Sequence, residues 1–163
     1  MEKSKQVKKL ESNIKSSYGT FVVFPILTLI YVIRCFIAGD LNYYFASFFS
    51  EFLLKHTGYF EGYKEGLSLP LALAIIVVYN ALFALCYVLS CKNFKWTYFG
   101  FALFVFDFAL EIFCIVTNYF EPFHVDMLVD VIVHAFIAFF LILGMVSYKK
   151  LEKIGSEKLT QNV

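Results

Sequence analysis

Four long apolar stretches, separated by polar segments, dominate the pattern of the chain. They cover residues 20–38, 67–90, 96–117 and 123–147. A bilayer core about 30 Å thick needs about 20 apolar residues in a helix that rises 1.5 Å per residue, so each stretch is long enough to cross it. Lipid offers no partner to an unpaired backbone group, and the stretches show no alternation of period two, so we expect helices and not a barrel. The pattern therefore predicts an all-α protein, a four-helix antiparallel transmembrane bundle.

A different pattern occupies residues 41–55, in the loop between the first two stretches. Apolar residues recur there at intervals of three and four, at Leu41, Tyr44, Phe45, Phe48, Phe49 and Phe52. This spacing is typical of an amphipathic helix, and its aromatic content suits the interface between lipid and water. We expect an interfacial helix that lies on the membrane surface as a connector. The alternative is a lid over the contents of the bundle.

The composition supports a membrane environment. Of the 163 residues, 60% are hydrophobic and only 17% are charged, whereas about a quarter are charged in an average soluble domain. A soluble fold of this length could not bury so much apolar surface, so the lipid bilayer is the expected surrounding. The net charge of +1 argues against nucleic acid as a partner, because nucleic-acid binding requires a basic surface.

The distribution of lysine predicts an orientation. Residues 1–19, the short link after residue 90 and residues 148–163 together hold eleven lysines, whereas the loop between the first two stretches holds two. Lysine and arginine accumulate on the cytoplasmic side of membrane proteins. We therefore expect residues 1–19 and 148–163 to be cytoplasmic tails that flank one membrane domain, residues 20–147.

Six polar side chains within the apolar stretches are the candidate ligand-binding residues: Arg34, Asn80, Asp107, Glu111, Asp130 and His134. Charged groups inside a span are costly, and they usually face the bundle interior or a water-filled cavity. Residues four apart share a face of a helix, so the third and fourth spans each carry a stripe of two of these groups. We expect His124 and Asp126, near the outer end of the fourth span, to be solvated.

The two stripes should meet across the hairpin that joins the third and fourth spans. In antiparallel neighbours, residues at equal distance from a short turn lie at a similar depth. By this count Asp107 is level with His134, and Glu111 is level with Asp130, one turn nearer the outer side. The candidates of the first two spans should lie near these layers, although the arginine could instead extend to the outer interface.

Carboxylates and an imidazole in one region suit a cavity, open to the outside, that binds a cation or a small polar or amphipathic ligand. Proton-coupled transport, alone or as a homo-oligomer, is the most specific form of this hypothesis. Two alternatives stay open. The polar core could only specify helix packing or the docking of a partner, or the protein could be a lipid-modifying enzyme that uses the carboxylates and His134 as acid and base.

Sequence motifs do not favour an enzyme or a cofactor. The chain lacks HExxH, GxSxG and phosphate-binding glycine patterns, and no motif links the loop serines, Ser47 and Ser50, to the histidine of the fourth span. The four ionisable groups of the last two spans could bind a metal ion, but ligand types alone do not predict one. We therefore expect no resident metal and no cofactor.

Overall fold

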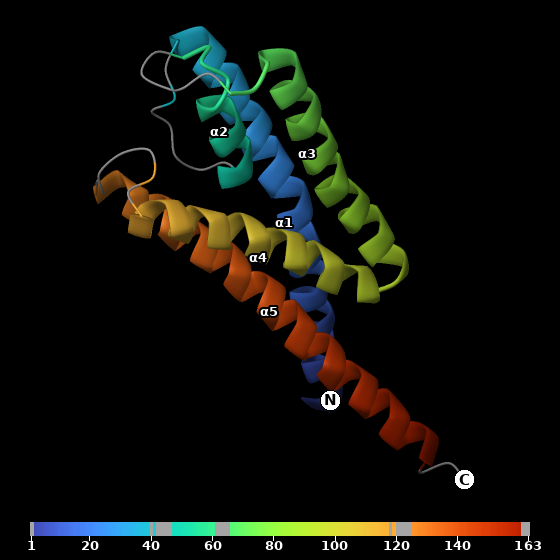
Figure 1. The fold of residues 1–163 in the computed structure, drawn as a ribbon. Helices are drawn as coiled ribbons and strands as arrows, with labels where there is room; N and C mark the ends of the chain where they lie inside the picture. Colours follow the sequence, from blue (N-terminus) through green and yellow to red (C-terminus); the bar gives the residue numbers. More distant parts are fainter. Residues whose placement is uncertain are drawn as a thin grey trace.

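The computed structural model describes residues 2–39, 41, 47–60, 66–117, 119 and 125–160, and these residues form helices and short connections without any strand. The helices are α1 (Glu2–Ala38), α2 (Phe48–Lys55), α3 (Leu69–Lys92), α4 (Lys95–Thr117) and α5 (Val125–Thr160) (Figure 1). Four of them, α1, α3, α4 and α5, are long and apolar enough to cross a membrane. The predicted all-α architecture with four long apolar helices is confirmed.

The outer surface of the bundle is strongly apolar. Ile37 of α1 is 81% exposed, Val77 of α3 is 68% exposed, Val116 of α4 is 74% exposed and Ile132 of α5 is 61% exposed. Side chains of this kind would be costly in water, at about 25 cal/mol per Å² of apolar surface, but they suit a lipid environment. A helix that is apolar all round in this way is typical of a membrane span.

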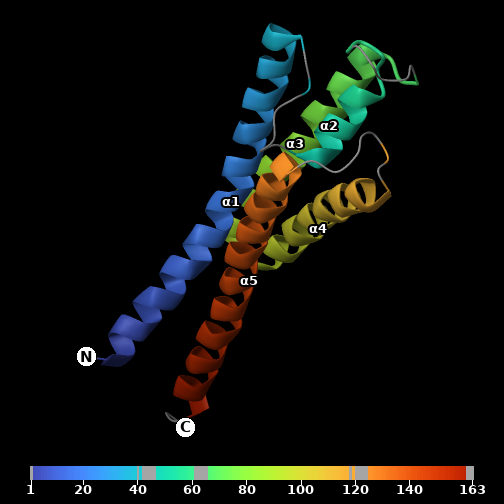
Figure 2. The same ribbon diagram turned by 90° about the vertical axis from the view of Figure 1, so that its left-hand side faces the viewer.

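Helices α1 and α5 are much longer than α3 and α4. With 37 and 36 residues, α1 and α5 are about 55 Å long at 1.5 Å per residue, whereas α3 and α4 are about 35 Å long. Both termini lie at the same end of the molecule, beyond the turn that joins α3 to α4 (Figures 1 and 2). Most of the predicted tails, residues 1–19 and 148–163, is therefore helical and continues α1 and α5.

Small residues allow α1 to approach its neighbours closely. A Cβ atom on Gly144 of α5 would collide with the Ser17 side chain of α1, and one on Gly100 of α4 would collide with the Phe21 ring of α1. Close approach at small residues is a common way to pack helices in membranes. The most extensive helix contact in the described part of the chain is accordingly that between α1 and α5.

Helix α2 is buried, in contrast to the surface position expected from its amphipathic pattern. Six of its eight residues are buried, and it packs against α3 and α4. Its first turn lies beside the middle of α4, where Ser47 contacts Asp107. Its end lies beside the start of α3, where the backbone oxygen of His56 accepts the N–H of Leu67 at 2.9 Å. The short helix therefore lies inside the bundle. Non-spanning backbone of this kind can occur at membrane depth where it is enclosed by protein.

Two apolar clusters border this arrangement. One joins α1, α2 and α3 around Tyr31, Leu54 and Ile76. The other joins α1, α3, α4 and α5 around Phe24 and Phe104. The buried ionisable groups lie where α2, α4 and α5 meet.

Candidate functional site

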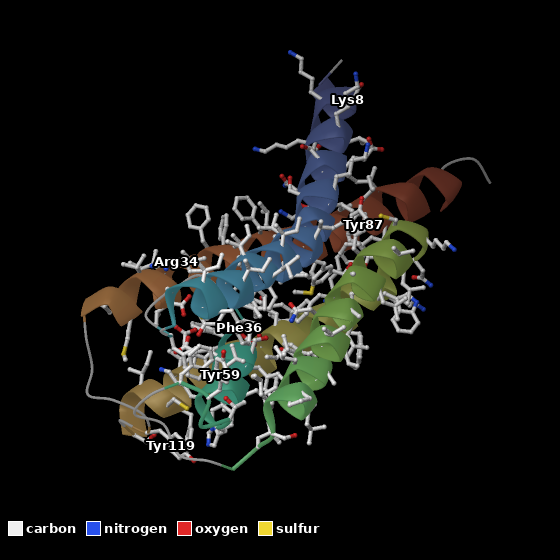
Figure 3. All side chains as sticks on the ribbon, turned by 90° about the horizontal axis from the view of Figure 1, so that it is seen from above. Lys8, Arg34, Phe36, Tyr59, Tyr87 and Tyr119 are labelled. Carbon is white, nitrogen blue, oxygen red and sulfur yellow. The ribbon has the colours of Figure 1, made fainter. Side chains whose placement is uncertain are left out.

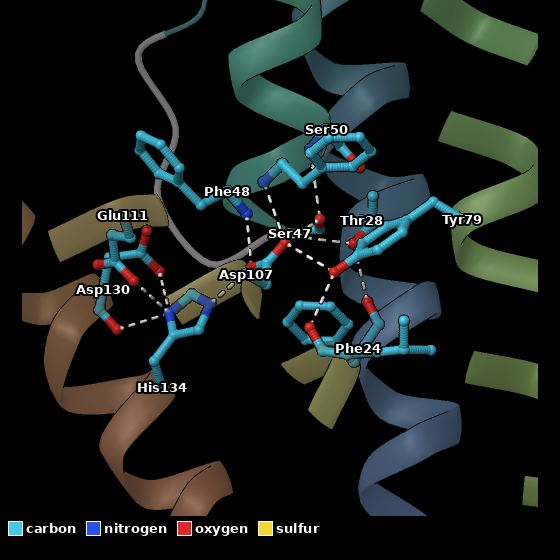
Figure 4. Close-up of polar contacts among 12 residues, drawn as sticks. Phe24, Thr28, Ser47, Phe48, Ser50, Tyr79, Asp107, Glu111, Asp130 and His134 are labelled. Atoms are coloured by element: carbon cyan, nitrogen blue, oxygen red, sulfur yellow. Dashed lines mark hydrogen bonds and ion pairs between the residues drawn. The ribbon is translucent and has the colours of Figure 1, made fainter. Parts of the chain in front are cut away.

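The four ionisable candidates of the last two spans form one buried cluster. Asp107 and Glu111 come from α4, and Asp130 and His134 come from α5 (Figure 4). Each of the four residues is at most 4% exposed. Because α4 and α5 pack against each other, the spacing of four on each helix turns both stripes toward the same space.

His134 lies at the centre of the cluster. Its Nε2 atom is 3.3 Å from Oδ2 of Asp107. Its Nδ1 atom is 3.1 Å from Oε2 of Glu111 and 3.3 Å from Oδ1 of Asp130, and 3.0 Å from the backbone oxygen of Asp130. The imidazole therefore joins all three carboxylates.

Aromatic rings enclose the imidazole of His134. The rings of Phe104 and Phe108 stack on it, each with a centroid distance of 5.6 Å, and Phe24 meets it edge-on at 6.0 Å. These three rings hold the ring plane of His134, so that its two nitrogens stay directed at the carboxylates.

Asp107 is richly supplied with hydrogen-bond donors. Besides His134, its carboxylate accepts hydrogen bonds from the Ser47 hydroxyl at 2.7 Å, the backbone N–H groups of Phe48 and Phe49 at 2.9 and 3.0 Å, and the Tyr79 hydroxyl at 3.3 Å (Figure 4). The carboxylate thus sits at the N-terminus of α2. Unpaired backbone N–H groups and the helix dipole favour a negative charge at this position.

Three residues of this arrangement were not predicted from the sequence: Thr28, Ser47 and Tyr79. The Ser47 backbone N–H donates to the Thr28 hydroxyl at 3.1 Å, which in turn donates to the backbone oxygen of Phe24 at 3.0 Å. A serine before an apolar helical pattern is a known N-cap signal and could have marked the start of α2. It could not have shown which carboxylate the helix faces.

Glu111 and Asp130 lack such donors. Both oxygens of Glu111 and Oδ1 of Asp130 are buried, and none of them accepts a hydrogen bond from the part of the chain that the structure describes. The polar contact of Oε2 of Glu111 and Oδ1 of Asp130 is an ion pair with Nδ1 of His134, at 3.1 and 3.3 Å. Glu51 of α2 lies within electrostatic range of Glu111 and pairs with Lys55 at 2.6 Å. The buried carboxyl groups of the region therefore outnumber its buried basic groups.

Asn80 lies apart from the cluster. It is half-buried on α3, and its Nδ2 atom donates to the backbone oxygen of Ile76 at 2.8 Å. Successive residues of a helix are about 100° apart around its axis. Because Tyr79 faces Asp107, the neighbouring asparagine is turned away from it.

Arg34 also lies apart from the cluster. Its side chain is exposed on α1, close to the end of that helix (Figure 3). The four residues of the cluster are buried, so the exposed arginine is not one of the groups enclosed with them. His124 and the side chain of Asp126 lie outside the described residues.

Together, the fold and the cluster indicate a class: proteins with four helices that could span a membrane and a buried polar core. No family model, curated protein or solved structure matches the chain.

Proposed function

We propose that this protein binds a cation in the buried cluster between α4 and α5. The observation that carries the proposal is Glu111, which is 1% exposed and whose two carboxylate oxygens accept no hydrogen bond from the described residues. A buried carboxylate without donors costs several kcal/mol when it is ionised. A bound cation would remove this cost, because it would interact with the unsatisfied oxygens of Glu111 and Asp130 together.

A purely structural polar core explains these contacts less well. Interhelical hydrogen bonds in membranes contribute only about 0.6 kcal/mol on average, and a structural core is expected to satisfy its polar groups. Asp107 meets this expectation, since it holds the N-terminus of α2. Glu111 and Asp130 contact the imidazole of His134, but three of their oxygens accept no hydrogen bond from the described residues. We therefore assign a structural role to Asp107 and ligand binding to the other two carboxylates.

The contacts also do not favour a hydrolytic enzyme. Asp107 lies between Ser47 and His134 and contacts both. In a nucleophilic triad the imidazole lies between the hydroxyl and the carboxylate, so that it can take the hydroxyl proton. Here the Ser47 hydroxyl donates to a carboxylate, so it is held as a helix cap.

Transport coupled to protons is the more specific form of the proposal. Its support is the re-entrant helix α2, whose N-terminus lies beside the middle of α4. In membrane transporters, short or interrupted helices that end near the membrane midplane form the sites for substrates and coupling ions. A cavity that opens away from the termini would give the cation its path.

The test is cation binding and flux with the full chain in detergent and in liposomes. We expect at least one inorganic cation to raise the melting temperature by about 5 °C or more at saturation, and to enter liposomes at a rate that depends on the pH gradient. Glu111→Gln should lose both effects. Glu152→Gln, the same change at an exposed position of α5, should keep them. If no cation affects the folded protein, or if Glu111→Gln responds like the unchanged chain, the proposal is wrong.

A further inference from the structure

From the geometry around His134 we infer that the cation is a divalent transition-metal ion, bound by Glu111, Asp130 and Nδ1 of His134. This inference rests on the proposed function and names the class of ligand. One ligand atom from each of the three residues lies within 4.8 Å of the others. The Nδ1 atom is 3.1 Å from the glutamate oxygen and 3.3 Å from the aspartate oxygen.

These separations are close to those that a bound metal ion requires. Ligand atoms at about 2.1 Å from one ion lie about 3.0–3.5 Å apart in octahedral or tetrahedral geometry. Two sides of the triangle already fall in this range, so a small movement of the third pair of atoms would complete three bonds to one ion.

The surroundings of His134 are those of a metal ligand. A metal-binding histidine usually donates its other ring N–H to a carboxylate or a carbonyl, which fixes the ring. Here Nε2 faces Asp107, and Asp107 is itself held by Ser47 and by the backbone N–H groups at the start of α2. The stacked rings of Phe104 and Phe108 fix the imidazole from its faces. The Nδ1 atom thereby faces the two carboxylates. It also contacts the backbone oxygen of Asp130 at 3.0 Å, and it would give up this contact and the proton it shares there when an ion binds.

The unsatisfied oxygens are an independent sign of a ligand. Glu111 is 1% exposed and Asp130 is 4% exposed, and three of their oxygens accept no hydrogen bond from the described residues. All three ligating groups converge on the space in front of Nδ1 (Figure 4). This space is therefore bordered by three groups that could bind one ion together.

The ligand set selects the kind of ion. Ca²⁺ and Mg²⁺ prefer sites built from oxygen atoms alone, whereas an imidazole nitrogen with carboxylate oxygens suits Mn²⁺, Fe²⁺, Co²⁺ or Zn²⁺. A charge of +2 also balances Glu111 and Asp130, and a monovalent ion would leave one carboxylate uncompensated in an apolar interior.

The test uses Co²⁺, Zn²⁺ and Mn²⁺ as probes of the full chain in detergent. We expect one Co²⁺ per chain, with visible ligand-field absorption, and displacement of that Co²⁺ by Zn²⁺. Glu111→Gln and Asp130→Asn should each weaken binding at least tenfold, and Glu152→Gln should leave it unchanged. Pulsed EPR of bound Mn²⁺ should show coupling to an imidazole nitrogen that is absent in His134→Gln. Circular dichroism checks that each variant is folded, and the two carboxylate variants test the site independently of each other.

The result can separate this inference from the proposed function. If the folded chain binds none of the three ions at about 1 mM, a concentration that detects even weak sites, but is stabilised by Na⁺ or K⁺, the metal assignment is wrong and cation binding stands. If neither group of ions binds, both proposals fail. Metal binding that persists unchanged in Glu111→Gln and Asp130→Asn would also overturn the assignment, since the ion would then lie elsewhere.

Discussion

One turn of helix α4 separates two carboxylates with opposite surroundings. Asp107 and Glu111 share a face and are both fully buried. Asp107 is level with the N-terminus of α2 and accepts its free backbone N–H groups. Glu111 lies one turn further along α4, within electrostatic range of the Glu51 side chain, where the backbone of α2 is already hydrogen-bonded within the helix. The position of each carboxylate relative to α2 therefore decides which one accepts hydrogen bonds from the start of α2 and which one does not.

Two serines at the start of α2, Ser47 before its first residue and Ser50 within it, provide a matched test of this contrast. Ser47→Ala removes both the helix cap and the hydroxyl that donates to Asp107, and we expect a loss of about 1–2 kcal/mol in the free energy of unfolding. The Ser50 hydroxyl is buried and has no hydrogen-bond partner among the described residues, so Ser50→Ala should change stability by no more than about 0.5 kcal/mol. Unfolding in detergent measures both. Equal effects would mean that the Ser47–Asp107 contact contributes nothing specific.

At the scale of elements, the pairing of α1 with α5 forms the longest part of the molecule. The contact continues beyond the ends of α3 and α4, where Leu10 and Ile14 of α1 are buried and the Asn13 amide donates to the Ser147 hydroxyl at 3.0 Å. Gly144 allows α5 to lie directly on Ser17. The two helices therefore depend on one small residue for their closest approach.

Two glycines of α5 test this dependence. Gly144→Ala would place a Cβ atom against Ser17, and we expect a loss of about 1–3 kcal/mol, because a packed interface must open. Gly155 has no atom within 4 Å of the position that a Cβ would take, so Gly155→Ala should stabilise the helix by up to about 1 kcal/mol. Melting temperatures in detergent should move in opposite directions. A Gly144→Ala variant as stable as the unchanged chain would show that α1 and α5 can separate without cost.

The helix within residues 41–55 shows what an amphipathic pattern can and cannot predict. Apolar residues at intervals of three and four indicated a helix, and α2 is present over Phe48–Lys55. The same pattern could not distinguish a lipid surface from a protein interior, since both present an apolar face. The position depends on polar partners outside the pattern: Thr28 and Asp107 bond to Ser47 at the start of α2, and Tyr79 bonds to Asp107.

At the scale of the whole molecule, the sequence predicted the number and type of the long helices because length and apolar content alone determine a span. The spacing of four on two neighbouring spans also predicted which groups could meet, and Asp107 and His134 are indeed in contact. It could not place Arg34 and Asn80, because depth along a helix does not give rotation about its axis. The capping of Asp107 by α2 depends on a contact between segments about 60 residues apart, which no local pattern encodes.

The orientation of the molecule remains a prediction from its lysines, and Cys91 offers a direct test. It is the exposed cysteine of the four, near the end of α3 at which the turn to α4 begins, and the other three are buried. If that end faces the cytoplasm, a membrane-impermeant maleimide should label inverted vesicles and not intact cells. Cys91→Ser should abolish the labelling, and Gly66→Cys in that background should be labelled from outside. Labelling of Cys91 in intact cells would reverse the orientation.

The buried position of α2 also determines at what stage of synthesis this helix can pack into the bundle. Its eight residues are too few to cross a bilayer. The backbone N–H groups of Phe48 and Phe49 lack their acceptor in the folded protein until Asp107, about 60 residues later in the chain, has been translated, and until then water must take its place. After the first span is inserted, we therefore expect the α2 segment to lie at the membrane surface, where an amphipathic helix is stable. It can enter the bundle only after α4 is in place. The surface helix that the sequence pattern indicated is thus expected in the growing chain. In the folded protein the same helix is buried, and its N-terminus is hydrogen-bonded to Asp107.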